Sequence, residues 1–176
     1  VCEGEATSFN NTSTPQFNMN FIWDFGDGFN SSVNSPNHTY ASCGSYDVNL
    51  YISDTNNFCN DDTTFTIVVN CNPVAIFSAP NVCSTDTLYL TDTSTPGTGT
   101  INTWNWSNNI YNTPNTNPSY IILDSCGAIG NQSLTIIDDN SCTDNTTITI
   151  YQHCNPTASF IASEVCQGDG NVLSSN

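Results

Sequence analysis

The chain is a tandem repeat, and its cysteines mark the repeat length. Nine cysteines occupy positions 2, 43, 59, 71, 83, 126, 142, 154 and 166 of the 176 residues. The intervals between them run 41, 16, 12 and 12 residues, and then 43, 16, 12 and 12. Neighbouring residues repeat as well, since the tract Cys71-Asn72-Pro73 returns as Cys154-Asn155-Pro156. A period of about 82 residues predicts tandem domains rather than a solenoid of short units.

These repeats divide the chain into two domains and the start of a third. We expect a first domain at 1–71 that lacks its opening strand, a second at 72–154, and a third that begins at 155–176. The sequence would then be one piece of a longer array. The Asn-Pro linkers that follow Cys71 and Cys154 are very short, and proline fixes its own φ angle. We therefore expect a semi-rigid rod rather than domains on a loose string.

All formal charge in the chain has one sign. There is no Lys or Arg, and 16 Asp and Glu residues give a formal net charge of −16. Nothing in the sequence can neutralise a nucleic-acid backbone or an anionic membrane surface, so partners of these two classes are excluded. No apolar run approaches the roughly 20 residues of a membrane span, and no membrane insertion is expected. Solvent cations such as calcium or magnesium are the natural counter-charges.

Apolar residues alternate with polar ones at the period of a β-strand. The alternation is clearest at 46–52 and 65–69, which flank a turn at 54–57, and a third alternating run lies at 17–23. No helical period is present. Short strands between Asn, Pro and Gly turns predict an all-β fold of tandem immunoglobulin-like β-sandwich domains.

We expect the cysteines to form disulfides rather than to bind zinc, because no C-x-x-C motif is present. The predicted hairpin places Cys43 opposite Cys71 at its open end, and repetition adds the pair Cys126 and Cys154. Each bond closes a loop of about 28 residues and would stabilise the fold by roughly 3 kcal/mol. Two disulfides per repeat imply an oxidising location outside the cytosol.

The remaining cysteines have two possible arrangements. Pairing within each repeat would join Cys2 to Cys59 and Cys83 to Cys142. In an immunoglobulin-like sandwich, however, the hairpin tip that carries Cys59 lies far from Cys2. The tip of one domain would then bond the base of the previous domain, as in a bond between Cys2 and Cys142. Both arrangements agree with the spacings, which assign no partner to Cys166.

Three motifs of the first domain resemble those of the PKD (polycystic kidney disease) domain. They are Trp-Asp-Phe-Gly-Asp-Gly at 23–28, a His-Thr-Tyr tract that ends at Tyr40, and Gly-Ser-Tyr-Asp-Val-Asn-Leu at 44–50. Ser35 stands where the family pattern has Asn. The second domain is degenerate, because Trp-Asn-Trp-Ser-Asn-Asn at 104–109 lacks both aspartates and both glycines. The resemblance implies an immunoglobulin-like sandwich, extracellular stalks, and contacts with proteins or carbohydrates.

Cysteine-bearing PKD arrays rich in Asn and Thr resemble parts of giant surface proteins of Bacteroidota, among them gliding-motility adhesins exported by the type IX secretion system. This resemblance implies an extracellular, cell-surface location and a role in cell adhesion or in a filament. It also implies that neighbouring repeats of the same chain are partners, with surface glycans or proteins as further partners.

Tryptophan and histidine residues are expected to be structural. Trp23 and Trp104 should be equivalent core residues, with Trp106 in the place of Phe25. The resemblance gives His38 a structural hydrogen bond. No set of Ser, His and Asp or of Cys and His indicates catalysis, so the chain is not expected to be an enzyme.

Asp24 and Asp27 flank the turn at Gly26 and are the candidate metal ligands. Carboxylates in a Gly-rich turn can supply the oxygen ligands of calcium. Alternatively, they accept hydrogen bonds from the backbone amides of the turn. Two further acidic pairs, at 61–62 and 138–139, lie near hairpin tips, where they would be solvated or would share a cation with a neighbouring domain. No other cofactor is expected.

The sequence therefore predicts a non-catalytic stalk or filament segment of a large extracellular adhesin, which spaces or presents a binding tip. Two alternatives stay open. The repeats themselves could recognise a glycan or a protein, or they could form a PKD spacer in a secreted hydrolase.

Overall fold

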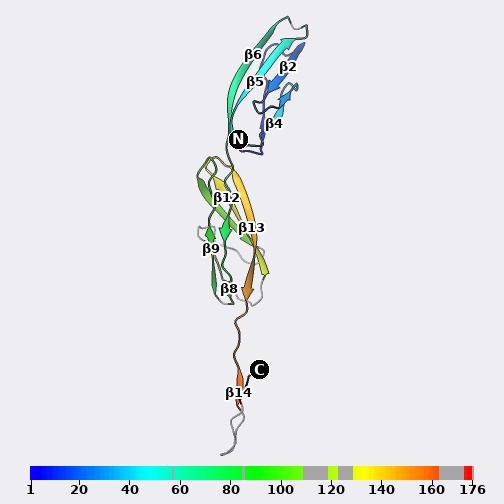
Figure 1. The fold of residues 1–176 in the computed structure, drawn as a ribbon. Helices are drawn as coiled ribbons and strands as arrows, with labels where there is room; N and C mark the ends of the chain where they lie inside the picture. The colour runs from blue at the N-terminus through cyan, green and yellow to red at the C-terminus, as the bar shows by residue number, and fades with distance from the viewer. Residues whose placement is uncertain (57, 85, 109–118, 123–128, 163–172, 176) are drawn as a thin grey trace, which may run out of the picture.

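The computed structural model describes residues 1–56, 58–84, 86–108, 119–122, 129–162 and 173–175. The regular secondary structure assigned within these residues consists of β-strands alone, which confirms the predicted all-β class. No helical segment in the described part of the chain has the length and apolarity that a membrane crossing needs. The strands form two groups that lie end to end (Figure 1). We term them the first unit, with strands at 6–69, and the second unit, with strands at 77–153.

Four antiparallel strands form the main sheet of the first unit, in the order β3-β2-β5-β6. Their bounds are β2 Met19–Asp24, β3 Asn30–Ser31, β5 Gly44–Asp54 and β6 Asn60–Val69. β5 and β6 make the predicted hairpin, with Gly44 opposite Val69 at its open end. A smaller sheet pairs β1 (Ala6–Ser8) with β4 (Asn37–Thr39).

The core of the first unit forms because the strands alternate buried and exposed side chains. Val48 and Leu50 are buried on β5, and Trp23 is buried on β2. Phe25, Tyr40 and Val69 complete the cluster. β6 is less well covered, since the side chain of Phe65 is 71% exposed. One face of this strand therefore lacks a neighbour within the unit.

The second unit is a two-layer sandwich. One sheet has the order β10-β12-β13-β8 and the other β11-β9-β7. The strands are β7 Phe77–Ser78, β8 Val82–Cys83, β9 Thr87–Asp92, β10 Ile101–Asn108, β11 Ser119–Ile122, β12 Ile129–Asp138 and β13 Thr143–His153. Both sheets contribute to one buried cluster: Phe77, Leu88, Leu90, Trp106, Leu134, Ile136 and Ile150. A short pair, β14 (Phe160–Ala162) and β15 (Leu173–Ser175), follows this unit.

Trp106, and not Trp104, is the structural counterpart of Trp23. Trp23 lies opposite Leu50 in the β2–β5 pair, and Trp106 lies opposite Leu134 in the β10–β12 pair. Leu50 and Leu134 both lie four residues before the Asp that ends their strand. The prediction that Trp104 takes the place of Trp23 is therefore wrong by two residues.

The burial of the two tryptophans agrees with this register. Trp106 is 6% exposed and meets the ring of Phe77 edge-on, with ring centroids 5.1 Å apart. Trp104 is only partly buried at the margin of the same cluster. The shift arises because the segment between Pro96 and Trp106 is two residues longer than its counterpart in the first unit.

Candidate functional site

Two carboxylates organise the Gly-rich turn that follows β2. Oδ1 of Asp24 accepts a hydrogen bond from the Gly26 amide at 2.9 Å, and Oδ1 of Asp27 accepts one from the Phe29 amide at 3.1 Å. Gly26 has a φ of 79°, and a Cβ there would lie 2.7 Å from the carbonyl oxygen of Asp47. A side chain would be both strained and obstructed, so the turn requires glycine to pass against β5.

An imidazole holds the second oxygen of Asp27. Nε2 of His38 lies 2.7 Å from Oδ2 of Asp27. The His38 ring stacks on Phe25, with centroids 4.0 Å apart and an interplanar angle of 3°, and meets Tyr40 edge-on at 4.7 Å. The Tyr40 hydroxyl in turn donates to the carbonyl oxygen of Phe25 at 3.1 Å. His38 therefore makes a structural hydrogen bond, as the resemblance to the PKD domain implies.

These contacts fix the ionisation of two groups. Burial works to raise the pKa of Asp27, but the hydrogen bonds from His38 and from the Phe29 amide outweigh it, and the pKa is lowered. Burial also raises the pKa of Tyr40 to about 12, with a smaller contribution from the charge of Asp27. At neutral pH the carboxylate is charged and accepts, whereas the phenol is protonated and donates.

Asp24 and Asp27 are thus engaged within the protein by the donors just described. Of their carboxylate oxygens, Oδ1 of Asp24 and both oxygens of Asp27 face protein donors. Among the described residues, no group of three or more His, Cys, Asp or Glu side chains is arranged to hold a metal ion. Calcium binding by these two residues stays a prediction. The contacts in the structure are those of the alternative, in which the carboxylates accept hydrogen bonds from backbone amides of the turn.

The acidic pairs near the hairpin tips have different surroundings. Asp61 and Asp62 are exposed on β6, and Asp62 accepts a hydrogen bond from Asn49 at 3.0 Å. Asp138, by contrast, is 2% exposed, because its Oδ1 accepts two backbone amides of its own turn. The expectation of a solvated side chain is therefore wrong for Asp138. Asp139 is exposed and accepts the amide of the residue that precedes β10.

One predicted disulfide is present in full. Cys43 bonds Cys71, with Cα atoms 4.7 Å apart, across the open end of the β5–β6 hairpin. Cys154 is also disulfide-bonded. Its predicted partner Cys126 lies outside the described residues, as does Cys166.

A second disulfide joins the two units. Cys2 bonds Cys142, with Cα atoms 5.6 Å apart, although the two residues are 140 positions apart in the sequence. Pairing of Cys2 with Cys59 and of Cys83 with Cys142 is therefore wrong, and both Cys59 and Cys83 are free and exposed. The physical reason is that the base of the first unit meets the hairpin tip of the second unit. The hairpin-tip cysteine of the first unit, Cys59, lies at the far end of the β5–β6 hairpin, away from Cys2.

A glutamate that sequence reasoning missed organises the base of the first unit. The carboxylate of Glu3 accepts the amide of Cys43 at 3.1 Å and the amide of Asn72 at 3.1 Å. Its carbonyl oxygen accepts Nδ2 of Asn72 at 3.2 Å. The position of Glu3 directly after the repeated Val-Cys pair is the signal that could have identified it. The linker residue Asn72 is consequently held by two hydrogen bonds to Glu3.

A loop of the second unit holds the other side of the linker. The hydroxyl of Thr98 accepts the amide of Cys71 at 2.8 Å, and the amide of Thr98 donates to the carbonyl oxygen of Cys71 at 3.2 Å. The preceding Gly97 lies so close that a Cβ there would overlap the same carbonyl oxygen. The two units therefore touch through the main chain as well as through the disulfide.

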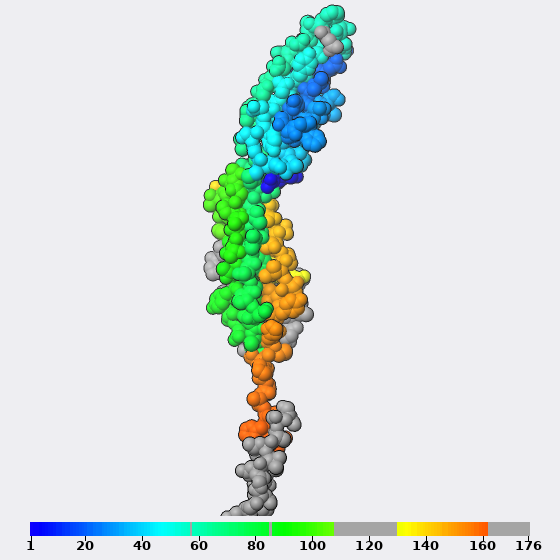
Figure 2. Space-filling view, in the orientation of Figure 1, coloured from blue at the N-terminus to red at the C-terminus, as the bar shows by residue number. Residues whose placement is uncertain are grey.

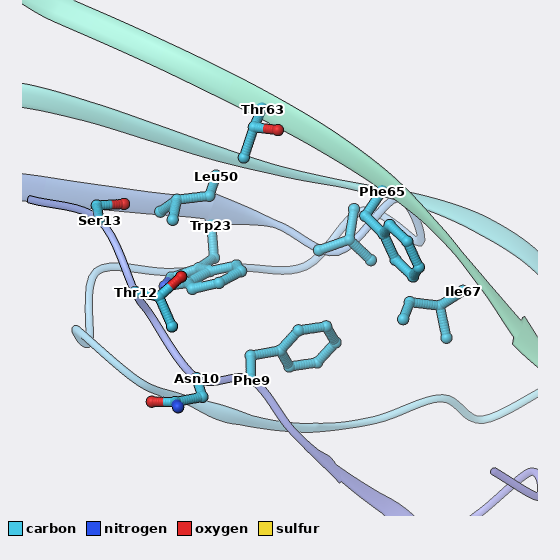
Figure 3. A pocket seen from close by; sticks show the side chains of 10 residues that line it. Phe9, Asn10, Thr12, Ser13, Trp23, Leu50, Thr63, Phe65 and Ile67 are labelled. Carbon is cyan, nitrogen blue, oxygen red and sulfur yellow. The ribbon is translucent and has the colours of Figure 1, made fainter.

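A groove of about 200 Å³ opens on the first unit between β6 and the segment 9–13. Figure 3 shows Phe9 on one side of it and Phe65 and Ile67 on the other. Trp23, Val48 and Leu50 also line the groove. Its lining is mostly apolar, and Trp23, Val48 and Leu50 belong to the core of the first unit, so the groove leaves part of this core uncovered.

The corresponding place in the second unit is filled by β7 and the residues just before it. Phe77 packs into the core there, and the amide of Ala75 donates to Oδ2 of Asp144 at 2.8 Å. Ile148, which corresponds to Phe65 in the repeat, packs against that core. The groove therefore lies where a unit of this kind has its first strand.

Residues 1–69 match the family model of the PKD domain. The matched stretch contains the Gly-rich turn, the Asp27–His38 pair and the whole β5–β6 hairpin. A microbial collagenase from Vibrio alginolyticus is 33% identical over 70 residues, which cover 38% of this chain and 8% of the collagenase. The chain therefore spans a small fraction of that relative.

Several solved structures are similar at low sequence identity. The fibronectin(III)-like modules of Clostridium thermocellum CbhA are 13% identical, with 86% of this chain and 87% of that chain covered and a TM-score of 0.40. Three N-terminal domains of the bacteriophage RB49 Hoc capsid protein are 12% identical, with coverage of 100% and 65% and a TM-score of 0.40. The mouse nectin-like molecule 4 ectodomain is 12% identical, with coverage of 89% and 62% and a TM-score of 0.40. Similarity at this level supports no conclusion about function.

PKD domains are typically non-catalytic spacer or binding modules. Together with the disulfides between Cys2 and Cys142 and between Cys43 and Cys71, the PKD match indicates an extracellular protein.

Proposed function

We propose that the chain is a non-catalytic segment of the stalk or filament of a large extracellular adhesin, and that it spaces or presents a binding tip at the cell surface. The gliding adhesins exported by the type IX system are the proposed class. The disulfide between Cys2 and Cys142 carries the proposal, because it joins two neighbouring units. A module that binds a ligand alone gains nothing from this bond, whereas a stalk gains stiffness.

The junction between the units restricts bending at two separate points. One is the short linker, in which Asn72 is held by Glu3 and followed by a proline. The other is the disulfide at the hairpin tip of the second unit. A flexible linker would let the units sample many angles, but two attachment points leave few. The elongated outline of the paired units in Figure 2 suits an array that supplies length.

Solution scattering of the chain tests this proposal. The oxidised protein should give a narrow distribution of maximum dimensions. A Cys2→Ser and Cys142→Ser double variant should give a broader distribution, because only the linker and the Thr98 contacts then join the units. Cys59→Ser is the matched control, since it removes an exposed free thiol and leaves the bond intact. Equal breadth in the oxidised protein and in the double variant would overturn the proposal.

The match to a collagenase favours one further candidate, a PKD spacer within a secreted hydrolase. In that case the polypeptide that contains this segment would also carry a catalytic domain. Mass spectrometry of the intact natural protein, followed by assay for peptidase and glycosidase activity, distinguishes the two candidates.

A further inference from the structure

Two exposed thiols occupy the same repeat positions as the two cysteines of the inter-unit bond. Cys83 corresponds to Cys2, and Cys59 corresponds to Cys142. Cys2 and Cys142 are both buried in their bond, whereas Cys59 and Cys83 are free and exposed. The backbone around each cysteine shows whether the free thiols are presented in the same way as the bonded ones.

The base of the second unit presents Cys83 as the base of the first unit presents Cys2. Each cysteine lies beside the last strand of its unit in a parallel pairing. The next residue donates its amide to that strand, at 2.9 Å for Glu3 and at 2.7 Å for Ser84. The cysteine carbonyl oxygen then accepts an amide three residues later, at 3.2 Å in both units. The two bases therefore share one backbone geometry.

The linker asparagines repeat the similarity. Nδ2 of Asn72 donates to the carbonyl oxygen of Glu3 at 3.2 Å, and Nδ2 of Asn155 donates to the carbonyl oxygen of Ser84 at 2.9 Å. The main-chain amide of Asn155 also reaches the Ser84 hydroxyl at 3.3 Å, where Asn72 reaches the Glu3 carboxylate. The second linker is thus held against the base of its unit in the same way as the first linker. The first linker connects two units that share a disulfide.

The hairpin tips share two hydrogen bonds between an aspartate and the tip cysteine. Asp54 donates its amide to the carbonyl oxygen of Cys59 at 2.9 Å, and Asp138 donates its amide to that of Cys142 at 3.0 Å. Oδ1 of each aspartate accepts the amide of the same cysteine, at 3.3 Å for Asp54 and at 2.8 Å for Asp138. In both tips, therefore, the aspartate that ends the strand binds the tip cysteine through its amide and its carboxylate, although the segment from Asp54 to Cys59 is one residue longer than the segment from Asp138 to Cys142.

Exposed aromatic side chains lie at the tip that carries Cys59. Phe58, next to Cys59, is 85% exposed, and Phe17 is 75% exposed. Asn18 accepts the amide of Thr55 at 3.0 Å, so the loop of Phe17 lies at this tip. In the second unit the corresponding loop contacts the first unit through Thr98. Exposed aromatic side chains at such a tip are the kind of surface that a docked domain would cover.

We propose that Cys83 and Cys59 are the two free halves of further inter-unit disulfides. Cys83 bonds the hairpin-tip cysteine of a following repeat, and Cys59 bonds the cysteine of the Val-Cys pair at the base of a preceding repeat. The partner class is another domain of this repeat, docked as the second unit docks on the first. The inference rests on the proposed function only in that both require an array of such domains.

The bond-forming step is thiol–disulfide exchange. Two thiols, one from each repeat, form one S–S bond and give up two electrons and two protons. A disulfide oxidant, such as oxidised glutathione or a disulfide-bonded oxidoreductase, accepts them and is reduced to two thiols.

Disulfide mapping of the natural protein tests the inference. Free thiols are blocked with iodoacetamide before extraction, and the protein is digested without reduction. Trypsin does not cut this segment, because it has no Lys or Arg. Cleavage before Asp releases the peptide 54–60, in which Cys59 is the single cysteine, and added cleavage after Phe releases 78–85, in which Cys83 is the single cysteine.

We expect both peptides to be disulfide-linked to cysteine peptides of other repeats, with less than about a tenth of either thiol alkylated. In a Cys83→Ser variant, one hairpin-tip cysteine of another repeat should become fully alkylated. Alkylation of Cys59 and Cys83 in most molecules, or a bond between the two, would overturn the inference. The Cys2–Cys142 bond in the same digest separates the two proposals: its presence beside alkylated Cys59 and Cys83 leaves the proposed stalk standing, and its absence removes the basis of both.

Discussion

At the scale of single residues, Asp27 links three parts of the first unit. Its carboxylate holds the Gly-rich turn through the Phe29 amide and holds His38 through the second oxygen. His38 in turn stacks on Phe25, which is part of the core. One charged side chain at the surface of the unit therefore positions an aromatic residue within it.

Asp27→Asn should destabilise the first unit by about 1–2 kcal/mol at pH 7, because a charge-assisted hydrogen bond is lost. The pKa of Asp27 is lowered in the folded state, so its contribution is present above the unfolded pKa and is lost as the pH falls through the folded pKa. The difference between the variant and the parent in urea unfolding curves should therefore shrink as the pH is lowered below 3.8, the ordinary pKa of Asp. Asp62→Asn, on exposed β6, is the control. A constant difference across this pH range would contradict the expected role of the charge.

The tryptophans of the second unit should differ in their effect on stability. Trp106→Ala removes a buried ring and should cost about 3–5 kcal/mol of unfolding free energy. Trp104→Ala removes a partly buried ring and should cost less than half as much. Thermal unfolding followed by circular dichroism measures both. Equal losses would argue that the two-residue shift in register is wrong.

At the scale of elements, features that depend on neighbouring residues could be predicted from the sequence, whereas features that depend on the length of a loop could not. The β5–β6 hairpin and the bond between Cys43 and Cys71 follow from alternation and from one turn, all within neighbouring residues. The place of Trp106 could not be predicted in this way, because two extra residues before β10 shift the register without changing the motif. The buried turn role of Asp138 was missed because it depends on backbone amides that only the folded turn brings together.

The groove on the first unit should accept an added β-strand. A copy of residues 72–81 fused ahead of Val1 should occupy it as β7 occupies the second unit. Covering Phe65 would stabilise β6 by about 2–3 kcal/mol, and amide exchange in β6 should slow by roughly 30- to 150-fold. An extension in which the counterparts of Ala75 and Phe77 are Asp is the matched control. Equal exchange with both extensions would show that the groove does not accept this strand.

At the scale of the whole molecule, the negative charge of the units and their end-to-end contact have opposite effects on how the units are held together. With a formal charge of −16 and no Lys or Arg, each unit repels its neighbour at low ionic strength. The Cys2–Cys142 bond holds the ends of the two units together against this repulsion. This pairing could not be settled from the spacings, because it depends on which surfaces of two domains meet.

Raising NaCl from about 10 to 300 mM should increase the melting temperature by several degrees, since salt screens like charges. The same rise is expected in magnesium and calcium chloride solutions at matched ionic strength. An additional rise in calcium alone, abolished by Asp24→Asn, would instead establish the calcium site that the sequence suggests. Differential scanning calorimetry measures each condition.

Two covalent paths between neighbouring units have a mechanical consequence. The main chain through Pro73 and the sulfur bridge from Cys2 to Cys142 cross the junction at different points. A single tether lets one body spin freely on the next, but two separated tethers resist twisting about the long axis. If one end of such a chain is turned, the rotation is passed on from unit to unit rather than lost at the first joint.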